Sequence, residues 1–495
     1  MREMWMMAPV LFPVVSGGAL WIWNPGKNKI HTAAAVLSLA EAVCSWLVIL
    51  NCMGMELPLW SIGPGMELCL RLDGTGALFS GLASLIWVLV VFFAFEYMEH
   101  EKEDARFFGC LIMSLGALTG VAWAGNFVTL YLFFEMMTFF SVPLVFHSRK
   151  REALRAGMVY LAYSMLGASI ALGGYFFFRQ YACGTDFKAG GVLAEAAGMA
   201  RGRPQILLLA VFFMAAGFSC KAGLMPLHPW LPIAHPVAPA PVSAVLSGLI
   251  TKAGVVAVIR VVYNMAGPAF LRGTWVQYAL LSMAVVTIFT GSMLAYKEKK
   301  LKRRLACSSF SQVSYVLLGV FLLSMEGLYG SLLQMVFHAL AKNALFLCAG
   351  AVICKTGCTR VKELRGMGKR MPAVMVCFAL SSLSLVGIPP AGGFLAKWHL
   401  AVGAMRAEDG VFAWLGPAVL MVSALLTAGY LFPVIVEAFF PGKDWRKTDQ
   451  SEDGRLSVSA FMGVPLAVLG ISLLVLGALG NPVFELLRGI ASDMV

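Results

Sequence analysis

The sequence predicts an all-α polytopic membrane protein with about 14 transmembrane helices, and three observations support this. Of its 495 residues, 59% are hydrophobic and 13% charged, with a mean hydropathy of +0.80. Soluble domains contain roughly 45–50% apolar and about 25% charged residues. Apolar stretches of about 20 residues, the length that crosses a bilayer, recur along the whole chain, and two of them are interrupted by proline and glycine. Soluble enzymes, nucleic-acid-binding proteins and secreted disulfide scaffolds are excluded.

The predicted spans follow one another through mostly short loops. The first 25 residues lack a small-residue cleavage site, so they are interpreted as a first span and not as a signal peptide. The seventh span contains KAGLMPLHPWLP and the twelfth contains GIPPAGG, and each motif breaks its helix part-way through the membrane. The fourteen predicted spans are 5–23, 32–52, 75–96, 107–124, 126–146, 157–178, 205–235, 239–265, 275–296, 305–325, 327–354, 372–404, 411–438 and 459–487.

The spacing of the two broken spans predicts an internal repeat. They lie five spans apart, and a five-span unit that is repeated once must be inverted, because five is odd. Matching interrupted helices in inverted repeats mark the ion or substrate path of many transporters. The predicted organisation is a three-helix segment (1–106), a first repeat of spans 4–8 (107–265), a second repeat of spans 9–13 (266–438), and a cytoplasmic loop with span 14 (439–495).

The basic residues predict the orientation of the chain. Of 38 Lys and Arg residues, 24 lie in the loops after the odd-numbered spans, nine lie on the other side and five lie within spans. Cytoplasmic loops collect Lys and Arg, so both termini are expected on the outer side. The net charge of +12 therefore reflects topology and requires no nucleic-acid partner.

Several ionisable residues fall inside the predicted spans, where each costs a few kcal/mol and suggests a function. A single buried lysine could simply extend its side chain to the interface, and this interpretation suits Arg260 near the end of span 8. It does not suit lysines near the middle of four different spans. Burial disfavours the ammonium form, and a nearby carboxylate favours it, so such groups can switch charge near neutral pH. The candidates for proton translocation are Glu135, Lys221, Lys252, Lys342 and Lys397.

Histidines accompany these residues. His338 precedes Lys342 by four positions and shares its helix face, which makes His338 a candidate proton relay, whereas a lone histidine is more often a satisfied core residue. His228 and His235 in PLHPWLPIAHP are candidates for an entrance, and His399 for the exit side. Their spacing is not that of a metal site.

Other polar residues are given no function. Glu41 lies inside span 2, where it either faces a neighbouring subunit or bonds to serine or backbone groups. Asp73 opens span 3 and is interpreted as structural. Cys354 and Cys358 lack further ligands nearby, so no metal site is predicted. No catalytic residue and no cofactor-binding motif is found, since there is neither a GxGxxG after a strand nor a cysteine group for an iron–sulfur cluster.

Five sequence stretches resemble the antiporter-like subunit family. This family includes proton-conducting membrane subunits of respiratory complex I, of Mrp-type sodium/proton antiporters and of energy-converting membrane-bound hydrogenases. The resemblance covers nearly the whole chain. The stretches are KAGLMPLHPWLPIAHPVAPAPVSAVLSGLITKAG (221–254), the surroundings of Glu135, LKRRLACSSFSQVSYVLLG (301–319), FHALAKNALFLCAG (337–350) and GIPPAGGFLAKW (387–398).

The resemblance implies a fourteen-helix fold with two inverted repeats, as the span count also predicts. It implies that Glu135 and Lys221 form the family's paired loading site and that Lys252 is the connecting lysine of span 8. One departure is YKEKKLKR before span 10, where an Asp often precedes LKR, so an intersubunit contact credited to that acid is in doubt. The proline-rich IAHPVAPAPVS leans towards the hydrogenase and Mrp branches.

The resemblance further implies that Lys342 and His338 lie on the family's polar central axis, with Lys397 as the exit residue. The first functional hypothesis is therefore a proton-translocating subunit of a redox-driven complex, with no catalytic redox centre in this chain. Its expected partners are other membrane subunits, including further antiporter-like ones, and a redox arm carrying iron–sulfur proteins. Its expected location is a prokaryotic cytoplasmic membrane.

The alternative functions either use the same buried residues or give them no part in proton transport. One is a subunit of a Mrp-type Na⁺/H⁺ antiporter without redox chemistry. Others are a stand-alone solute carrier, which would gather its polar groups around one pocket, and a structural scaffold, which the cost of burying four lysines disfavours. The sequence leaves open the parent complex, the coupling ion, the electron donor and acceptor, and the direction of pumping.

Overall fold

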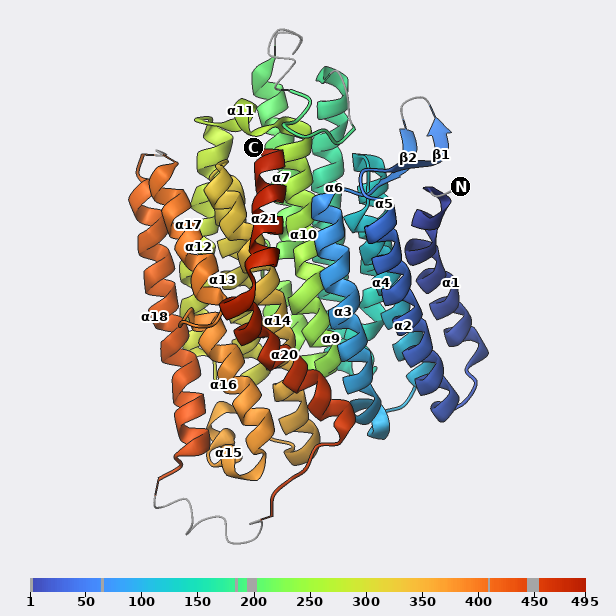
Figure 1. The fold of residues 1–495 in the computed structure, drawn as a ribbon, viewed down its shortest axis with the longest axis vertical. Coiled ribbons are helices and arrows are strands. Elements are labelled where there is room, and N and C mark those ends of the chain that lie inside the picture. Colours follow the sequence, from blue (N-terminus) through green and yellow to red (C-terminus); the bar gives the residue numbers. More distant parts are fainter. Residues whose placement is uncertain (1–2, 64–65, 183–185, 194–202, 408–409, 443–453) are drawn as a thin grey trace.

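The computed structural model describes residues 3–63, 66–182, 186–193, 203–407, 410–442 and 454–495. The chain forms an all-α membrane bundle (Figure 1), and it is an integral membrane protein, since twelve helices of the described residues are long and apolar enough to cross a bilayer. The helices are α1 (Ala8–Trp23), α2 (Lys27–Asn51), α3 (Gly74–Tyr97), α4 (Asp104–Ala122), α5 (Phe127–Val145), α6 (Arg151–Tyr181), α7 (Pro204–Ala222), α8 (Trp230–Val237), α9 (Ala240–Val245), α10 (Thr251–Ile259), α11 (Pro268–Leu271), α12 (Trp275–Lys297), α13 (Leu301–Phe321), α14 (Met325–Thr356), α15 (Met367–Arg370), α16 (Pro372–Val386), α17 (Gly393–Arg406), α18 (Phe412–Phe439), α20 (Ala460–Leu479) and α21 (Asn481–Met494).

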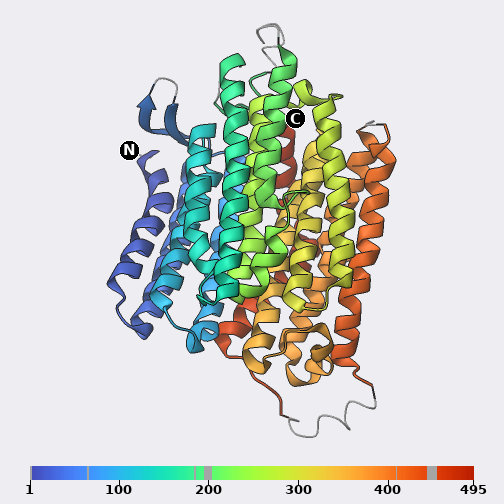
Figure 2. The same cartoon turned by 180° about the vertical axis from the view of Figure 1, so that it is seen from behind.

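All fourteen predicted spans coincide with helical segments. Two are not among the twelve apolar helices: α13, whose inner surface is rich in serine, and the pair α16–α17, which is interrupted. Viewed from behind, the helices follow chain order across the bundle from blue to orange (Figure 2). The inverted relation between the two predicted repeats stays a prediction.

Both predicted breaks are present and share one local cause. α7 ends before Gly223 (φ +86°), and α16 ends before Gly387 (φ +91°). These left-handed conformations suit glycine, because a side chain would be strained there. The chain resumes as α8 and α17, so each predicted span is made of two helices with irregular backbone between them.

The eighth predicted span contains two π-helical turns, η3 (Leu246–Ile250) and η4 (Arg260–Ala266), on either side of α10. Such turns are rare and are frequent at functional sites. Every residue of this span from Ala240 to Ala266 is buried, so α9, η3, α10 and η4 form the centre of the bundle.

Two features differ from the sequence prediction. The connection before α3 folds into an antiparallel hairpin, β1 (Glu56–Gly63) with β2 (Met66–Arg71). The last predicted span (459–487) is two helices, because α20 ends at Gly480 and Pro482 starts α21. α20 crosses the bundle obliquely and α21 turns upward, so both chain ends lie at the end that carries the hairpin (Figure 1). The predicted loop residues 443–453 lie outside the described residues.

Candidate functional site

Lys221 lies at the end of α7, where three hydroxyl groups bind its ammonium group. Its Nζ donates hydrogen bonds to Thr138 Oγ1 (2.8 Å), Tyr160 Oη (3.0 Å) and Ser164 Oγ (2.9 Å). The ammonium also lies 4.5 Å from the centre of the Tyr160 ring, a favourable cation–π distance. The lysine is buried, and all three donors of its ammonium are satisfied.

Glu135 lies on α5 one turn before Thr138 and is partly exposed at the side of the bundle. Glu135 and Lys221 form no direct ion pair within the described part of the chain. The two charges do interact through space. The predicted loading pair is thus placed in one neighbourhood, while hydroxyl groups occupy the lysine.

A short polar chain joins Lys252 to Lys342. Lys252 Nζ donates to the carbonyl of Ser247 in η3, and Ser247 Oγ lies 2.6 Å from Ser309 Oγ on α13. The adjacent Ser308 accepts a hydrogen bond from Lys342 Nζ, which also donates to the Leu305 carbonyl (2.9 Å). Both lysines are fully buried, and the serines of α13 lie between them.

His338 lies one turn before Lys342 on α14. The ring is buried on α14, and neither ring nitrogen has a hydrogen-bond partner among the described residues. It interacts electrostatically with Lys252, Lys342 and Lys397. The predicted relay thus lies within electrostatic range of three of the four predicted lysines and forms no hydrogen bond with them among the described residues.

His235 lies at the other edge of the axis. It is buried on α8, stacks on Phe346 (5.0 Å between ring centres), and has no partner for either ring nitrogen among the described residues. Lys252, Lys342 and Lys302 interact with it electrostatically. His228, in contrast, is half-buried in the break, where its ring lies 4.8 Å from Phe310.

One end of the bundle carries the loops rich in Lys and Arg and is called the basic end below. A cavity of about 280 Å³ opens at this end, beside the connection between α8 and α9. His147, Glu152 and Lys302 are among its lining residues. Lys302 Nζ donates to the carbonyls of Ala238 and Pro236 at the end of α8. The pKa of His147 is lowered to about 4 by burial and, second, by the Arg106 guanidinium. Pro236, which follows His235 in the chain, also lines the cavity.

Lys397 closes the second helix break. Its Nζ donates to the carbonyls of Leu385 and Val386, both at 2.7 Å. These are carbonyls of the last turn of α16, which have no partner within their own helix. The ammonium also lies 5.4 Å from the ring centre of Tyr315. Lys397 thus supplies the hydrogen bonds that irregular backbone needs inside a membrane.

His399 is placed two residues beyond Lys397, towards the end of the bundle that carries the termini. Its Nδ1 lies 3.2 Å from Glu326 Oε2, and Arg406 Nη1 lies 3.4 Å from Glu326 Oε1. All three are partly exposed in the single chain, with Arg406 the most exposed. They form an ionic group at the candidate exit.

The interpretation of Arg260 as an interfacial side chain is wrong. Arg260 is 1% exposed and forms a two-fold ion pair with Asp73, in which Nη2 lies 2.8 Å from Oδ1. It also donates to the Ala122 carbonyl at 3.1 Å. Burial would raise the pKa of Asp73, but Arg260 outweighs burial and holds that pKa below its usual value. The pair ties α3, α4 and η4 together.

Sequence reasoning missed the groups that surround the lysines. Their signal was available in part, because a span with as many polar residues as SSFSQVS (308–314) is unusual in a membrane. The described hydroxyl groups that contact the lysines or link them are those of Thr138, Tyr160, Ser164, Ser247, Ser308 and Ser309.

Two protein-family models match the chain. One, described as NADH:quinone oxidoreductase/Mrp antiporter, TM, matches residues 124–427, more than half of the chain. The second, described as NADH-Ubiquinone oxidoreductase (complex I), chain 5 N-terminus, matches residues 62–108. The first match contains Glu135 and all four buried lysines, Lys221, Lys252, Lys342 and Lys397.

Curated relatives and solved structures extend the similarity to the whole chain. NADH-quinone oxidoreductase subunit N of Desulforudis audaxviator is 33% identical over 82% of this chain and 80% of its own. One of the Na(+)/H(+) antiporter subunits of Alkalihalophilus pseudofirmus is 28% identical over 99% of this chain and 97% of its own. A chain of the membrane-bound sulfane sulfur reductase, an archaeal respiratory membrane complex, has the same fold, with a TM-score of 0.86, 24% identity and coverage of 99% and 97%.

Proposed function

Because the chain belongs to the family of NADH:quinone oxidoreductase and Mrp antiporter membrane subunits, we propose that it translocates protons as an antiporter-like subunit of a multi-subunit, redox-driven ion pump. The observation that carries this proposal is a series of polar contacts between two buried lysines. Lys252 donates to the Ser247 carbonyl, the Ser247 hydroxyl contacts Ser309, and Ser309 and Lys342 both donate to the Leu305 carbonyl. Electron transfer takes place in partner subunits, since this chain supplies the ion path.

The proposed path has an entrance, an axis and an exit. Protons enter at the basic end, through the cavity beside Lys302, and reach His235. Within the axis, His338 relays between the lysines of the two halves. The protons leave past Lys397 and His399. Water bridges the gaps between groups that do not touch.

The Glu135–Lys221 pair is the proposed control point. In the present state, hydroxyl groups hold the ammonium, and Glu135 attracts it without contact. A redox step in a partner subunit that moves Lys221 towards Glu135 would favour its charged form, and the reverse movement would favour proton release.

The proposed setting is the cytoplasmic membrane of a prokaryote, with both termini on the outer side. Both chain ends lie at the end of the bundle opposite α15 (Figure 1), and the odd-numbered loops, which are rich in Lys and Arg, are expected in the cytoplasm. The proposed partners are further antiporter-like membrane subunits and a redox arm with iron–sulfur proteins.

Proton uptake by the reconstituted parent complex tests the path. Lys221→Ala and Lys397→Ala are expected to reduce proton pumping at least tenfold, while the exposed loop variant Lys299→Ala leaves it unchanged. Full pumping in both the Lys221 and the Lys397 variant would refute the proposal.

The second candidate is a subunit of a Na⁺/H⁺ antiporter without redox chemistry, and the 28% identity to an antiporter subunit over almost the whole chain favours it. Native purification in mild detergent separates the two functions. Co-purification of flavin or iron–sulfur proteins supports the redox-driven pump. Sodium-dependent proton movement without any electron donor supports the antiporter.

A further inference from the structure

A buried acid on α2 lies outside the path described above. Glu41 is fully buried, and its Oε1 accepts a hydrogen bond from Ser45 Oγ at 2.6 Å. Its Oε2 is also buried and has no hydrogen-bond partner among the described residues. Only one of the two carboxyl oxygens therefore has a close hydrogen-bond partner among the described residues.

The side chain faces the protein and not the surface of α2. The outer face of this helix is apolar, with Val36, Val43 and Leu50 all more than half exposed. Ser38, Glu41 and Ser45 form the buried face, three to four residues apart. Of the two interpretations left open by the sequence, contact with a neighbouring subunit is excluded and a bond to serine is found.

No counter-charge accompanies this carboxyl group. None of the described ion pairs includes Glu41, and the titratable group that interacts with it is the Cys44 thiol of the same helix. The Thr119 hydroxyl of α4 also interacts with the carboxyl group as a hydrogen-bond partner, but it is neutral and supplies no counter-charge. An ionised carboxylate without a charged partner in a low-dielectric interior is very costly. The protonated form avoids this cost and supplies an O–H donor.

We propose that Glu41 is a proton-binding site separate from the central axis and that protons reach it from the basic end of the bundle through the Asp104–His31 pair. The proposal goes beyond the proposed function, because α2 contributes no residue to the path through Lys252 and Lys342. Each transfer moves one proton from water at that end to Glu41 Oε2, and no electron is transferred.

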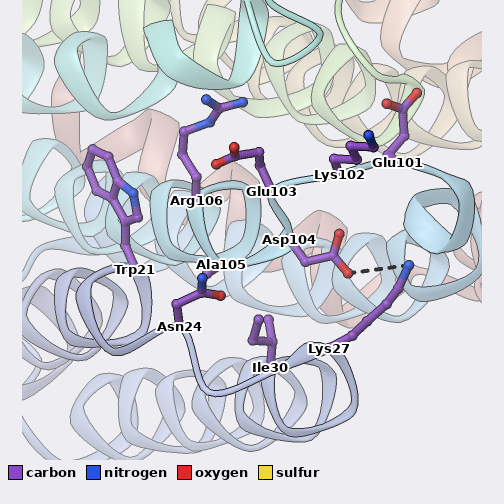
Figure 3. Close-up of a pocket in the computed structure, with 10 residues that line it drawn as sticks. All are labelled: Trp21, Asn24, Lys27, Ile30, Glu101, Lys102, Glu103, Asp104, Ala105 and Arg106. Carbon is purple, nitrogen blue, oxygen red and sulfur yellow. Dashed lines mark ion pairs between the residues drawn. The ribbon is translucent and has the colours of Figure 1, made fainter.

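The first step of this route is a cavity at the basic end, between the α1–α2 connection and the start of α4 (Figure 3). Its volume is about 440 Å³, and Asp104 and Lys27 line it with their charged groups 3.6 Å apart. Asp104 Oδ2 also lies 3.2 Å from His31 Nε2. Asp104 thus connects the cavity to an imidazole that points into the bundle.

The second step runs along the buried face of α2. His31 stacks on Phe95 of α3, with ring centres 4.9 Å apart, so its ring lies between helices. Ten residues of α-helix separate it from Glu41, a distance of about 15 Å. Ala34 and Ser38 lie between them on the buried face. In the proposed route the Ser38 hydroxyl, which donates to the Ala35 carbonyl in this state, and water that enters beside these small side chains carry the proton.

Infrared difference spectroscopy of the purified parent complex in lipid nanodiscs tests the protonation state. The spectrum of the wild type minus that of Glu41→Gln at pH 7 is expected to show the C=O band of a protonated carboxylic acid, and this band should shift in D₂O. Absence of the band, or a band that never shifts in D₂O, would overturn the proposal, since the latter describes a purely structural carboxyl group. If the Gln variant does not assemble, Glu41→Asp, which retains the acid, is expected to move the band.

The rate at which the band shifts tests the route. Asp104→Asn and His31→Gln are expected to slow the exchange at least fivefold. Glu101→Gln, a change of another acid on the same cavity, is the matched control and should leave the rate unchanged. Equal exchange rates in all variants would refute loading through the Asp104–His31 pair. Both experiments read Glu41 directly, so their outcome does not depend on the function proposed for the central axis.

Discussion

At the scale of residues, neutral oxygens hold the buried lysines. Hydroxyl groups hold Lys221, and carbonyls hold Lys252, Lys342 and Lys397, with one serine hydroxyl added at Lys342. A direct carboxylate partner would stabilise the ammonium strongly and oppose loss of its proton. Neutral acceptors allow both protonation states, which is the property that a proton path requires.

Tyr160→Phe tests this idea, because it removes one acceptor from Lys221 and retains the ring. A hydrogen bond to a charged group contributes about 1.5–3 kcal/mol, so the rate of proton transport by the reconstituted complex is expected to fall roughly tenfold. Tyr163→Phe is the control, since Tyr163 lies on the same helix and its hydroxyl group is not among the described partners of Lys221. Equal rates in the two variants would contradict this role of the Tyr160 hydroxyl.

The Asp73–Arg260 pair makes a second prediction at this scale. Asp73→Asn leaves a buried guanidinium without its counter-charge, and breaking such a pair costs about 3–5 kcal/mol. The temperature of thermal inactivation of the complex is expected to fall by several degrees. Glu56→Gln breaks the exposed Arg71–Glu56 pair, and the change there should be close to zero. Equal shifts in both variants would show that Arg260 has other sufficient partners.

At the scale of elements, the helix breaks place the candidate residues. Lys221 lies directly before one break, and Lys397 folds back onto the other. A continuous helix would use the last carbonyls of α16 for its own hydrogen bonds, and Lys397 would then have no acceptors there. The breaks therefore create the lysine environments.

Gly223→Ala tests the first break. Gly223 has φ +86°, and an added Cβ would lie 2.3 Å from Leu231 Cδ1. The left-handed conformation alone costs about 1–2 kcal/mol, and α8 would have to move. Lower transport and lower thermal stability are expected. Gly173→Ala in α6 is the control, because its Cβ would meet nothing within 4 Å; an equal loss in that variant would argue against a special role of the break.

The α5–α6 connection predicts a pH dependence of stability. The folded pKa of His147 is about 4, below its ordinary 6.5, so the unfolded chain binds the proton first as the pH falls. The stability from neutral His147 is complete above about pH 6.5 and is lost towards pH 4, with about 2 kcal/mol lost by pH 5. The temperature of thermal inactivation should therefore fall less between pH 7 and pH 5 in His147→Gln than in the wild type. An identical fall in both proteins would contradict this assignment.

The elements themselves were largely predictable from sequence. Apolar length located the helices, and Gly with Pro located both breaks. The π-helical turns beside Lys252 carry no comparable signal in the sequence; in the structure η3 packs against α14 and η4 packs against α7. The hairpin was missed, although ELPLWSIG and MELCLR are rich in strand-forming residues.

At the scale of the whole molecule, sequence reasoning found the charged residues and not their partners. Arg260 and Asp73 are 187 positions apart, and Lys221 and Thr138 are 83 positions apart. Such contacts depend on which helices become neighbours, and periodicity within one helix does not contain that information. The resemblance to the family predicted that Glu135 and Lys221 form a pair, but the three hydroxyl groups that bind Lys221 are found only in the three-dimensional structure.

The orientation of the molecule in the membrane can be tested by labelling one residue at each end of the bundle. Lys299 lies in the basic loop before α13, and Ala189 lies at the end of the bundle that carries both termini; both residues are exposed. If the basic loops face the cytoplasm, a membrane-impermeant maleimide added to intact cells should label Ala189→Cys. Lys299→Cys should be labelled only after the membrane is opened, and the wild type gives the background from the native cysteines. The reverse pattern would place the termini in the cytoplasm and would reverse the direction of the proposed path, because the cavity beside Lys302 would then open to the outside.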